Sequence, residues 1–206
     1  MRKAQRVSAA EAAALVQSGM WLDYGASLNQ PDQFDRALAE RRNELEQVKI
    51  RSTLSMRPRA VLEADPEGRH FFWFSWHFSG YDRRKHDVGR CSYMPLNLGE
   101  VPGYYRRFLD APDLAILKAR PKDERGYFNF GPTNVWYRDV VERSKVVVIE
   151  LAPGLPHACG VGNEVHESEV DYVIDGDSEP PPELVNPAVS EVDRAVARQI
   201  AAEVED

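Results

Sequence analysis

Residues 145–151 read KVVVIEL, the most strand-like stretch of the chain. Three valines and an isoleucine follow one another without a polar residue, so both faces of a strand here are apolar. A strand that is buried on both faces is typical of a parallel sheet with helices on each side. The stretch therefore predicts a parallel sheet rather than an antiparallel one with a solvent-exposed face.

Strand and helix patterns alternate around this stretch. Clusters of β-branched and aromatic residues predict strands at 20–25, 48–55, 70–78 and 113–119. Helical spacing of apolar residues predicts helices at 9–19, 31–45, 81–89, 99–109, 134–144 and 190–206. Ser8 and Glu11 form a capping box at the first helix, which we expect to end at Gly19, and Pro31 stands at the first position of the second helix. Residues 152–184 are predicted to be irregular, with one short strand and a proline-rich turn.

This alternation predicts a single α/β domain over residues 1–206, with a mostly parallel sheet flanked by helices. Ligands of such sheets bind beyond the carboxyl ends of the strands, where the chain reverses. The loops expected at those ends are Gly25–Pro31, Ser75–Gly80, Arg120–Phe130 and Ala152–Gly162. The third loop, with a proline, a glycine and several charges, is longer than a simple turn requires.

Composition excludes several classes of protein. A chain of 206 residues with 43% hydrophobic and 29% charged residues is typical of a globular domain. The net charge of -7 disfavours nucleic acid as a partner, and no apolar run reaches the roughly 20 residues that span a bilayer. The N-terminus lacks the apolar segment of a signal peptide, and two cysteines form no disulfide framework, so we expect a cytoplasmic protein.

No motif in the chain carries catalytic chemistry by itself. Phosphate-binding and dinucleotide-binding loops, a nucleophile elbow and paired zinc ligands are missing, and we predict neither a catalytic residue nor a metal site. His157, Cys159 and His166 match no structural zinc spacing. The basic clusters at 83–85 and 106–107 are interpreted as solvated helix faces, with contact to an anionic ligand or to a subunit as the alternative.

Several segments together resemble the N-terminal half of the acetyl-CoA hydrolase/CoA-transferase family, which includes 4-hydroxybutyrate CoA-transferases. VGRCSYMPLNLGEVP at 88–102 is similar to the family's G-R-x-x-Y-x-P-x-x-L-x-E-x-P stretch. LKARPKDERGYFNFGPTN at 117–134 is similar to its S-P-x-D-x-x-G loop, the most specific of the set. Residues 7–25, 30–50 and 148–175 resemble further family segments, and 192–206 resemble the helix that joins the two halves of longer members.

The resemblance implies a NagB/RpiA/CoA-transferase-like fold and transfer of coenzyme A between an acyl-CoA and a carboxylic acid, with coenzyme A as substrate rather than permanent cofactor. In such chemistry a Glu carboxylate forms an anhydride and then a Glu–CoA thioester. The family's Glu and its glycine-rich oxyanion loop lie in the second half, so a partner chain is expected to supply both. The substrate-binding residues implied for this chain are Gly25, Gln30, Pro31, Ser75, His77, Phe78, Lys122, Asp123, Gly126, Tyr127, Phe128, Pro156 and Gly160.

Departures from the family pattern leave alternatives open. Arg120 replaces the family's Ser, Ala152 replaces a usual Asn, and the segment at 70–85 is more aromatic than an acetate-sized substrate requires, which favours a bulkier acyl group. The chain is interpreted as the small subunit of a split enzyme or as a truncated form. The other functions considered are an acyl-CoA hydrolase subunit, a non-catalytic binding or regulatory subunit, and a stand-alone isomerase or deaminase on the same fold.

Overall fold

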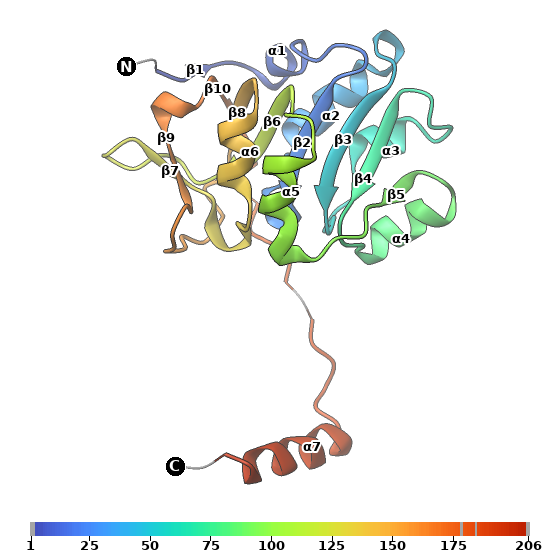
Figure 1. The fold of residues 1–206 in the computed structure, drawn as a ribbon, viewed down its shortest axis with the longest axis vertical. Helices are drawn as coiled ribbons and strands as arrows, with labels where there is room; N and C mark the ends of the chain where they lie inside the picture. The colour runs from blue at the N-terminus through green and yellow to red at the C-terminus, as the bar shows by residue number, and fades with distance from the viewer. Residues whose placement is uncertain (1–2, 178, 184, 205–206) are drawn as a thin grey trace.

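The computed structural model describes residues 3–177, 179–183 and 185–204. In this part of the chain eight strands form one sheet in the order β1-β10-β8-β6-β2-β3-β4-β5, and every neighbouring pair is parallel (Figure 1). The strands are β1 (Gln5–Arg6), β2 (Trp21–Ala26), β3 (Val48–Thr53), β4 (Phe71–Ser75), β5 (Cys91–Tyr93), β6 (Leu114–Ala119), β8 (Val146–Leu151) and β10 (Tyr172–Asp175). The predicted α/β fold with a mostly parallel sheet is confirmed.

Helices cover both faces of the sheet, and a separate antiparallel pair of strands lies beside it. The helices are α1 (Ala9–Ala13), α2 (Gln33–Glu40), α3 (Ala60–Ala64), α4 (Gly80–Asp87), α5 (Val101–Arg107), α6 (Tyr137–Arg143) and α7 (Glu191–Ala202). The antiparallel pair is β7 (Tyr127–Asn129) with β9 (Glu164–His166).

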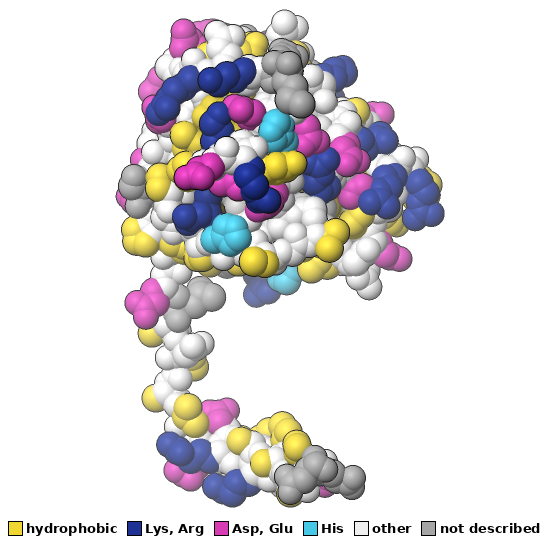
Figure 2. All heavy atoms as spheres, turned by 90° about the vertical axis from the view of Figure 1, so that its left-hand side faces the viewer, with side chains coloured by type: hydrophobic (Ala, Val, Ile, Leu, Met, Phe, Trp, Pro, Cys, Tyr) yellow, Lys and Arg dark blue, Asp and Glu magenta, His cyan; other side chains and the backbone are white. Residues whose placement is uncertain are grey.

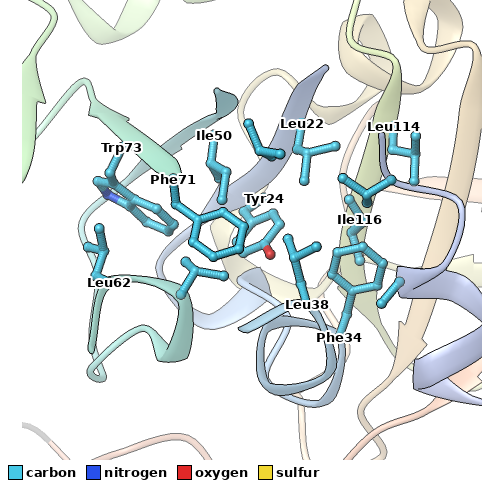
Figure 3. Packing of buried hydrophobic residues seen from close by; sticks show 14 of the residues in the cluster. Leu22, Tyr24, Phe34, Leu38, Ile50, Leu62, Phe71, Trp73, Leu114 and Ile116 are labelled. Atoms are coloured by element: carbon cyan, nitrogen blue, oxygen red, sulfur yellow. The ribbon is translucent and has the colours of Figure 1, made fainter. Parts of the chain in front are cut away.

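Two hydrophobic cores form because successive side chains of each strand point to opposite faces of the sheet. Ile116 packs with Phe34 and Leu38 of α2 on one face, where α1 to α4 lie (Figure 3). Leu117, the next residue, packs with α5 and α6 on the other face. The strand over residues 146–151 contributes to both cores in the same way, as its apolar run predicted.

The direction of the chain across the sheet reverses once. Strands β2, β3, β4 and β5 follow one another outward to one edge, and the chain then returns so that β6 pairs with the free side of β2. From there β6, β8 and β10 extend to the other edge, where β1 completes the sheet. The carboxyl ends of β2 and β6 therefore flank the topological switch point, the place where open α/β sheets bind ligands.

Several helix boundaries differ from the sequence predictions, and two of the differences have a clear physical cause. The Ser8–Glu11 capping box is present, but α1 ends at Ala13 rather than at Gly19. The Arg41 guanidinium donates hydrogen bonds to the carbonyls of Ala13 and Val16, which satisfies acceptors that a longer helix would have used. Pro31 lies outside α2, which begins at Gln33 because a buried carboxylate receives the first free amides of the helix there.

The strand predictions missed several short elements. Strands β1 and β7 and helix α3 were not predicted, and the stretch predicted to be irregular contains two strands, β9 and β10, rather than one. These elements have two to five residues, too few to show a hydrophobic period. Val135 and Trp136 precede α6 rather than belonging to it.

Helix α7 lies apart from the body of the molecule, and none of its described residues is buried (Figure 1). A capping box of Ser190 and Asp193 begins this helix. In Figure 2 its hydrophobic side chains gather on one side and most of its charged side chains on the other. Among the described residues, no helix combines the length and the apolar character needed to cross a bilayer.

Candidate functional site

The loops at the carboxyl edge of the sheet contain strained backbone beside the switch point. Ser27 directly follows β2 with a φ of 49°, and Leu54 directly follows β3 with a φ of 50°. Non-glycine residues adopt this left-handed region at a cost of about 1–3 kcal/mol, and such strain clusters at functional sites. The geometry therefore singles out the ends of β2 and β3 as candidate binding loops.

A buried ion-pair cluster lies between these loops. Asp32 accepts hydrogen bonds from Arg59 Nη2 at 2.8 Å and from Arg57 Nη1 at 3.0 Å, and it pairs with Lys118 Nζ. Burial by itself raises the pKa of Asp32, but Arg59 and then Lys118 outweigh it and bring the pKa below its usual value. Asp32 is therefore ionised at neutral pH and fixed by three cations.

Glu150, near the end of β8, caps the N-terminus of α2. Its carboxylate accepts the backbone N–H groups of Asp32 at 2.9 Å, of Gln33 at 3.0 Å and of Phe34 at 3.0 Å. The side chain is fully buried, and burial raises the pKa of Glu150. Helix N-termini at the edge of such sheets commonly hold anions, but here the protein's own carboxylate occupies that position.

The first cavity at the switch point is small, with a volume of about 30 Å³. Its walls include Ser27, Gln30, Met56, Arg57 and Lys118. Asp177 and residues 179–182, named the strap here, form another part of the wall. The strap is held by an Arg36–Asp177 ion pair at 2.7 Å and an Arg57–Glu179 ion pair at 3.2 Å.

Each carboxylate in the described wall of this cavity is engaged in an ion pair. These carboxylates are Asp32, Asp177 and Glu179. A carboxylate that is held by cations is a poor nucleophile, since its charge is already neutralised. The described part of the cavity wall thus holds no free carboxylate for covalent catalysis.

A second cavity, of about 430 Å³, lies at the carboxyl ends of β4 and β5. It is walled by Trp76, Phe78, Tyr93, Leu96, Leu98 and Val101, with His77, His86 and Arg83 as the polar side chains. The loop after β3 connects the two cavities, because Leu54 N–H donates to the carbonyl of His77 at 2.8 Å. The cavities are therefore neighbours along the same edge of the sheet.

Four of the predicted substrate-binding residues lie at or beside these cavities. Gln30 lines the first, and its side-chain amide donates to Ser52 Oγ at 2.5 Å. The carbonyl of Pro31, next to it, accepts a hydrogen bond from Arg59. His77 and Phe78 line the second cavity.

The remaining predicted residues do not line either cavity. Gly25 and Ser75 are buried, and Gly25 has a positive φ of 63° with Leu117 and Tyr137 against it. Pro156 and Gly160 lie in the loop after β8. The other five belong to the segment that forms β7: Lys122, Asp123, Gly126, Tyr127 and Phe128.

The segment with β7 folds against β9 instead of covering the cavities. Lys122 pairs with Glu167, and the Asp123 carboxylate accepts the N–H of Tyr127 at 2.9 Å, which closes the turn. Gly126 has a φ of 87°, so a glycine suits that turn, while Phe128 is in the core. Acidic and basic side chains alternate on the face that includes this pair of strands (Figure 2). A binding role for this segment stays a prediction.

The sequence predictions missed the charged residues of the site, namely Asp32, Arg57, Arg59, Lys118 and Glu150. The sequence contained a signal that could have identified two of these residues as part of a site. Lys118 and Glu150 are single charges inside otherwise apolar strands, and a buried charge is retained only where it is paired. Among the described residues, no group of three or more His, Cys, Asp or Glu is arranged to hold a metal ion.

Comparisons with known proteins place these features in a family. Residues 2–185 match the acetyl-CoA hydrolase/transferase N-terminal domain. The chain is 37% identical to a butyryl-CoA:acetate CoA-transferase from Anaerostipes caccae, over 96% of this chain and 45% of that protein. It is 34% identical to a succinyl-CoA:cyclohexane-1-carboxylate CoA transferase from Geobacter metallireducens, over 97% of this chain and 44% of that protein.

The fold is similar to a solved structure as well. RipA from Yersinia pestis superposes with a TM-score of 0.84 at 20% identity, over 98% of this chain and 49% of that one. The chain thus spans about half the length of the relatives that it matches. With a family match over most of its residues, the chain belongs to the acetyl-CoA hydrolase/transferase family.

Proposed function

We propose that this chain is one subunit of an acyl-CoA:carboxylate CoA-transferase whose catalytic Glu and oxyanion loop are on a partner chain. The observation that carries the proposal is the site at the switch point, where the described cavity walls contain cations and paired carboxylates but no free one. Both curated relatives described above are CoA-transferases about twice as long as this chain. The second half of each relative has no counterpart in this chain, and we propose that a partner chain supplies the equivalent part of the site.

The proposed reaction has two exchange steps. The partner's Glu carboxylate attacks the thioester carbonyl of the acyl-CoA, the C–S bond breaks, and an acyl–Glu anhydride and CoA thiolate result. The thiolate then attacks the Glu carbonyl of the anhydride, which releases the first carboxylate and leaves a Glu–CoA thioester. The second acid reverses these steps. Water must be excluded, since it hydrolyses both intermediates.

In this scheme the chain contributes the loops at one side of the active site, and the partner chain covers the other side. The Asp32 cluster and the Glu150 cap hold the loops after β2 and β3 in place. The strap, Asp177 and residues 179–182, forms part of the wall of the first cavity. The apolar stripe of α7, formed by Val192, Val196 and Ile200, is exposed and suits a partner surface.

Native mass spectrometry of the protein purified from its own host tests the partner. We expect a second chain in equal number, and the pair should exchange CoA between butyryl-CoA and acetate while this chain alone does not. A monomer or homodimer that transfers CoA by itself would show that the nucleophile lies in this protein rather than on a partner chain. No transfer by any isolated complex would favour a non-catalytic subunit.

Hydrolysis is the second candidate, because the matched family includes hydrolases as well as transferases. The two activities differ in their dependence on the acceptor acid. A transferase forms no free CoA thiol and needs the acid, whereas a hydrolase releases CoA at a rate independent of added acid. Measuring free thiol across a series of acetate concentrations separates them.

A further inference from the structure

The second cavity has the size and lining of a ligand site. Its volume of about 430 Å³ lies in the usual range for small-molecule pockets, roughly 300–1,000 Å³. Phe78 is packed edge-on against Tyr93 at a ring distance of 5.0 Å, and leucines from the loop after β5 form the opposite wall. A two-carbon acid would leave most of this volume unfilled.

Trp76 forms part of the cavity wall although only 6% of its surface is exposed. Its indole N–H is buried and has no hydrogen-bond partner among the described residues. Because the N–H itself is inaccessible, the ring meets a ligand through its apolar carbons. The indole signal of Trp76 therefore reports on the cavity through ring contact.

The charges around the cavity select the kind of ligand. Arg83 is the one permanent cation in the described lining, His77 and His86 are the other polar side chains, and no carboxylate faces the cavity. This lining favours an anion with a single charge. The nucleotide end of coenzyme A carries several phosphate charges, for which one guanidinium is a poor match.

We propose that the second cavity binds the body of a bulky, apolar carboxylic acid, alicyclic or aromatic, with its carboxylate paired to Arg83 at the mouth. The apolar ring lies against Trp76, Phe78, Tyr93 and the leucines. The identification of this acid as a substrate rests on the proposed CoA-transferase function; its binding does not.

Binding is measured on the 206-residue chain by NMR of the ¹⁵N-labelled indole groups. The Trp76 signal is assigned from its loss in Trp76→Phe. Titration with cyclohexane-1-carboxylate should shift this signal with saturation, while acetate at the same concentrations should not. Cyclohexylmethanol, which lacks the charge, should bind more weakly than the acid.

Matched variants locate the site. Tyr93→Ala removes one aromatic wall and should weaken binding of cyclohexane-1-carboxylate about threefold to tenfold, whereas Tyr104→Ala, on α5 and paired with Phe108 at 5.3 Å, should not. Arg83→Gln should weaken it about twofold to fivefold, since the pair is exposed. Arg84→Gln, the next residue of α4 and outside this cavity, is its control.

Three results would overturn the proposal. They are an unmoved Trp76 signal, an equal shift with acetate, and a shift with adenosine 3′,5′-bisphosphate that the acid cannot displace. The proposed function fails in a different way, through absence of CoA transfer with every partner while cyclohexane-1-carboxylate still shifts the Trp76 signal.

Discussion

Replacing Glu150 tests whether this carboxylate is the acceptor that starts α2. Glu150→Leu keeps the approximate volume but leaves the N–H groups of residues 32–34 without their partner. Each unsatisfied buried N–H costs about 1–3 kcal/mol, and part of that loss is returned because a carboxylate no longer has to be buried. We expect the free energy of unfolding to fall by about 3–5 kcal/mol, and Tm to fall by roughly 10–15 °C.

Glu150→Gln separates hydrogen-bond acceptance from charge. The amide keeps one carbonyl oxygen, so this variant should lose only about 1 kcal/mol. Burial raises the pKa of Glu150, so the folded chain holds this proton more tightly than the unfolded chain does. The wild type's stability therefore falls as the pH rises above the unfolded pKa, and its advantage over Glu150→Gln should shrink in the same direction.

Urea unfolding at several pH values measures these differences, with Glu142→Leu, on an exposed position of α6, as the control that should change stability by less than about 0.5 kcal/mol. If Glu150→Leu unfolds at the same urea concentration as the wild type, the N–H groups do not depend on this carboxylate. If the Gln variant is as unstable as the Leu variant, charge matters more than acceptance. Either result would refute the account of how α2 begins.

Three other perturbations have defined outcomes. Burial raises the pKa of Asp35 to about 6, so the folded chain holds a proton that the unfolded chain releases near pH 4. The free energy of unfolding should therefore fall by about 3 kcal/mol between pH 4 and pH 6. Urea titrations should show that this fall is smaller in Asp35→Asn. Gly126→Ala should cost about 1–2 kcal/mol because φ is positive there, and transfer assays on the folded variant test the proposed role of the loop. Val196→Glu with Ile200→Glu should abolish copurification of the partner while leaving the unfolding midpoint of the body unchanged, whereas Arg198→Glu should retain the partner.

The strands that could be predicted are those with a complete apolar pattern. Residues 113–119 and 145–151 carry enough buried side chains to specify a parallel sheet, and the cap at Ser8 is local in sequence. The loop positions at the carboxyl edge followed from the same alternation. The fold and the positions of the loops at the carboxyl edge could therefore be predicted from the sequence.

The contents of the site were less predictable because they depend on residues far apart in sequence. Asp32 meets Lys118 only after β6 has returned beside β2, and Glu179 reaches Arg57 only through the strap. The segment with Gly126 follows a strand that ends at the correct edge, but three residues of β7 redirect it toward β9. Such short pairings leave no periodic signal in the sequence.

The strand order also determines when the sheet can assemble during translation. A nascent chain can build β2, β3, β4 and β5 in the order of synthesis, each beside the one before. Until residues 114–119 emerge, the other side of β2 is an open edge in the middle of the future sheet, where another chain could pair. β1, made first, must wait for residues 172–175 before it has a neighbour. Since domains are synthesised at about 5–20 residues per second, this edge stays open for seconds, and the half-built sheet needs protection for that time.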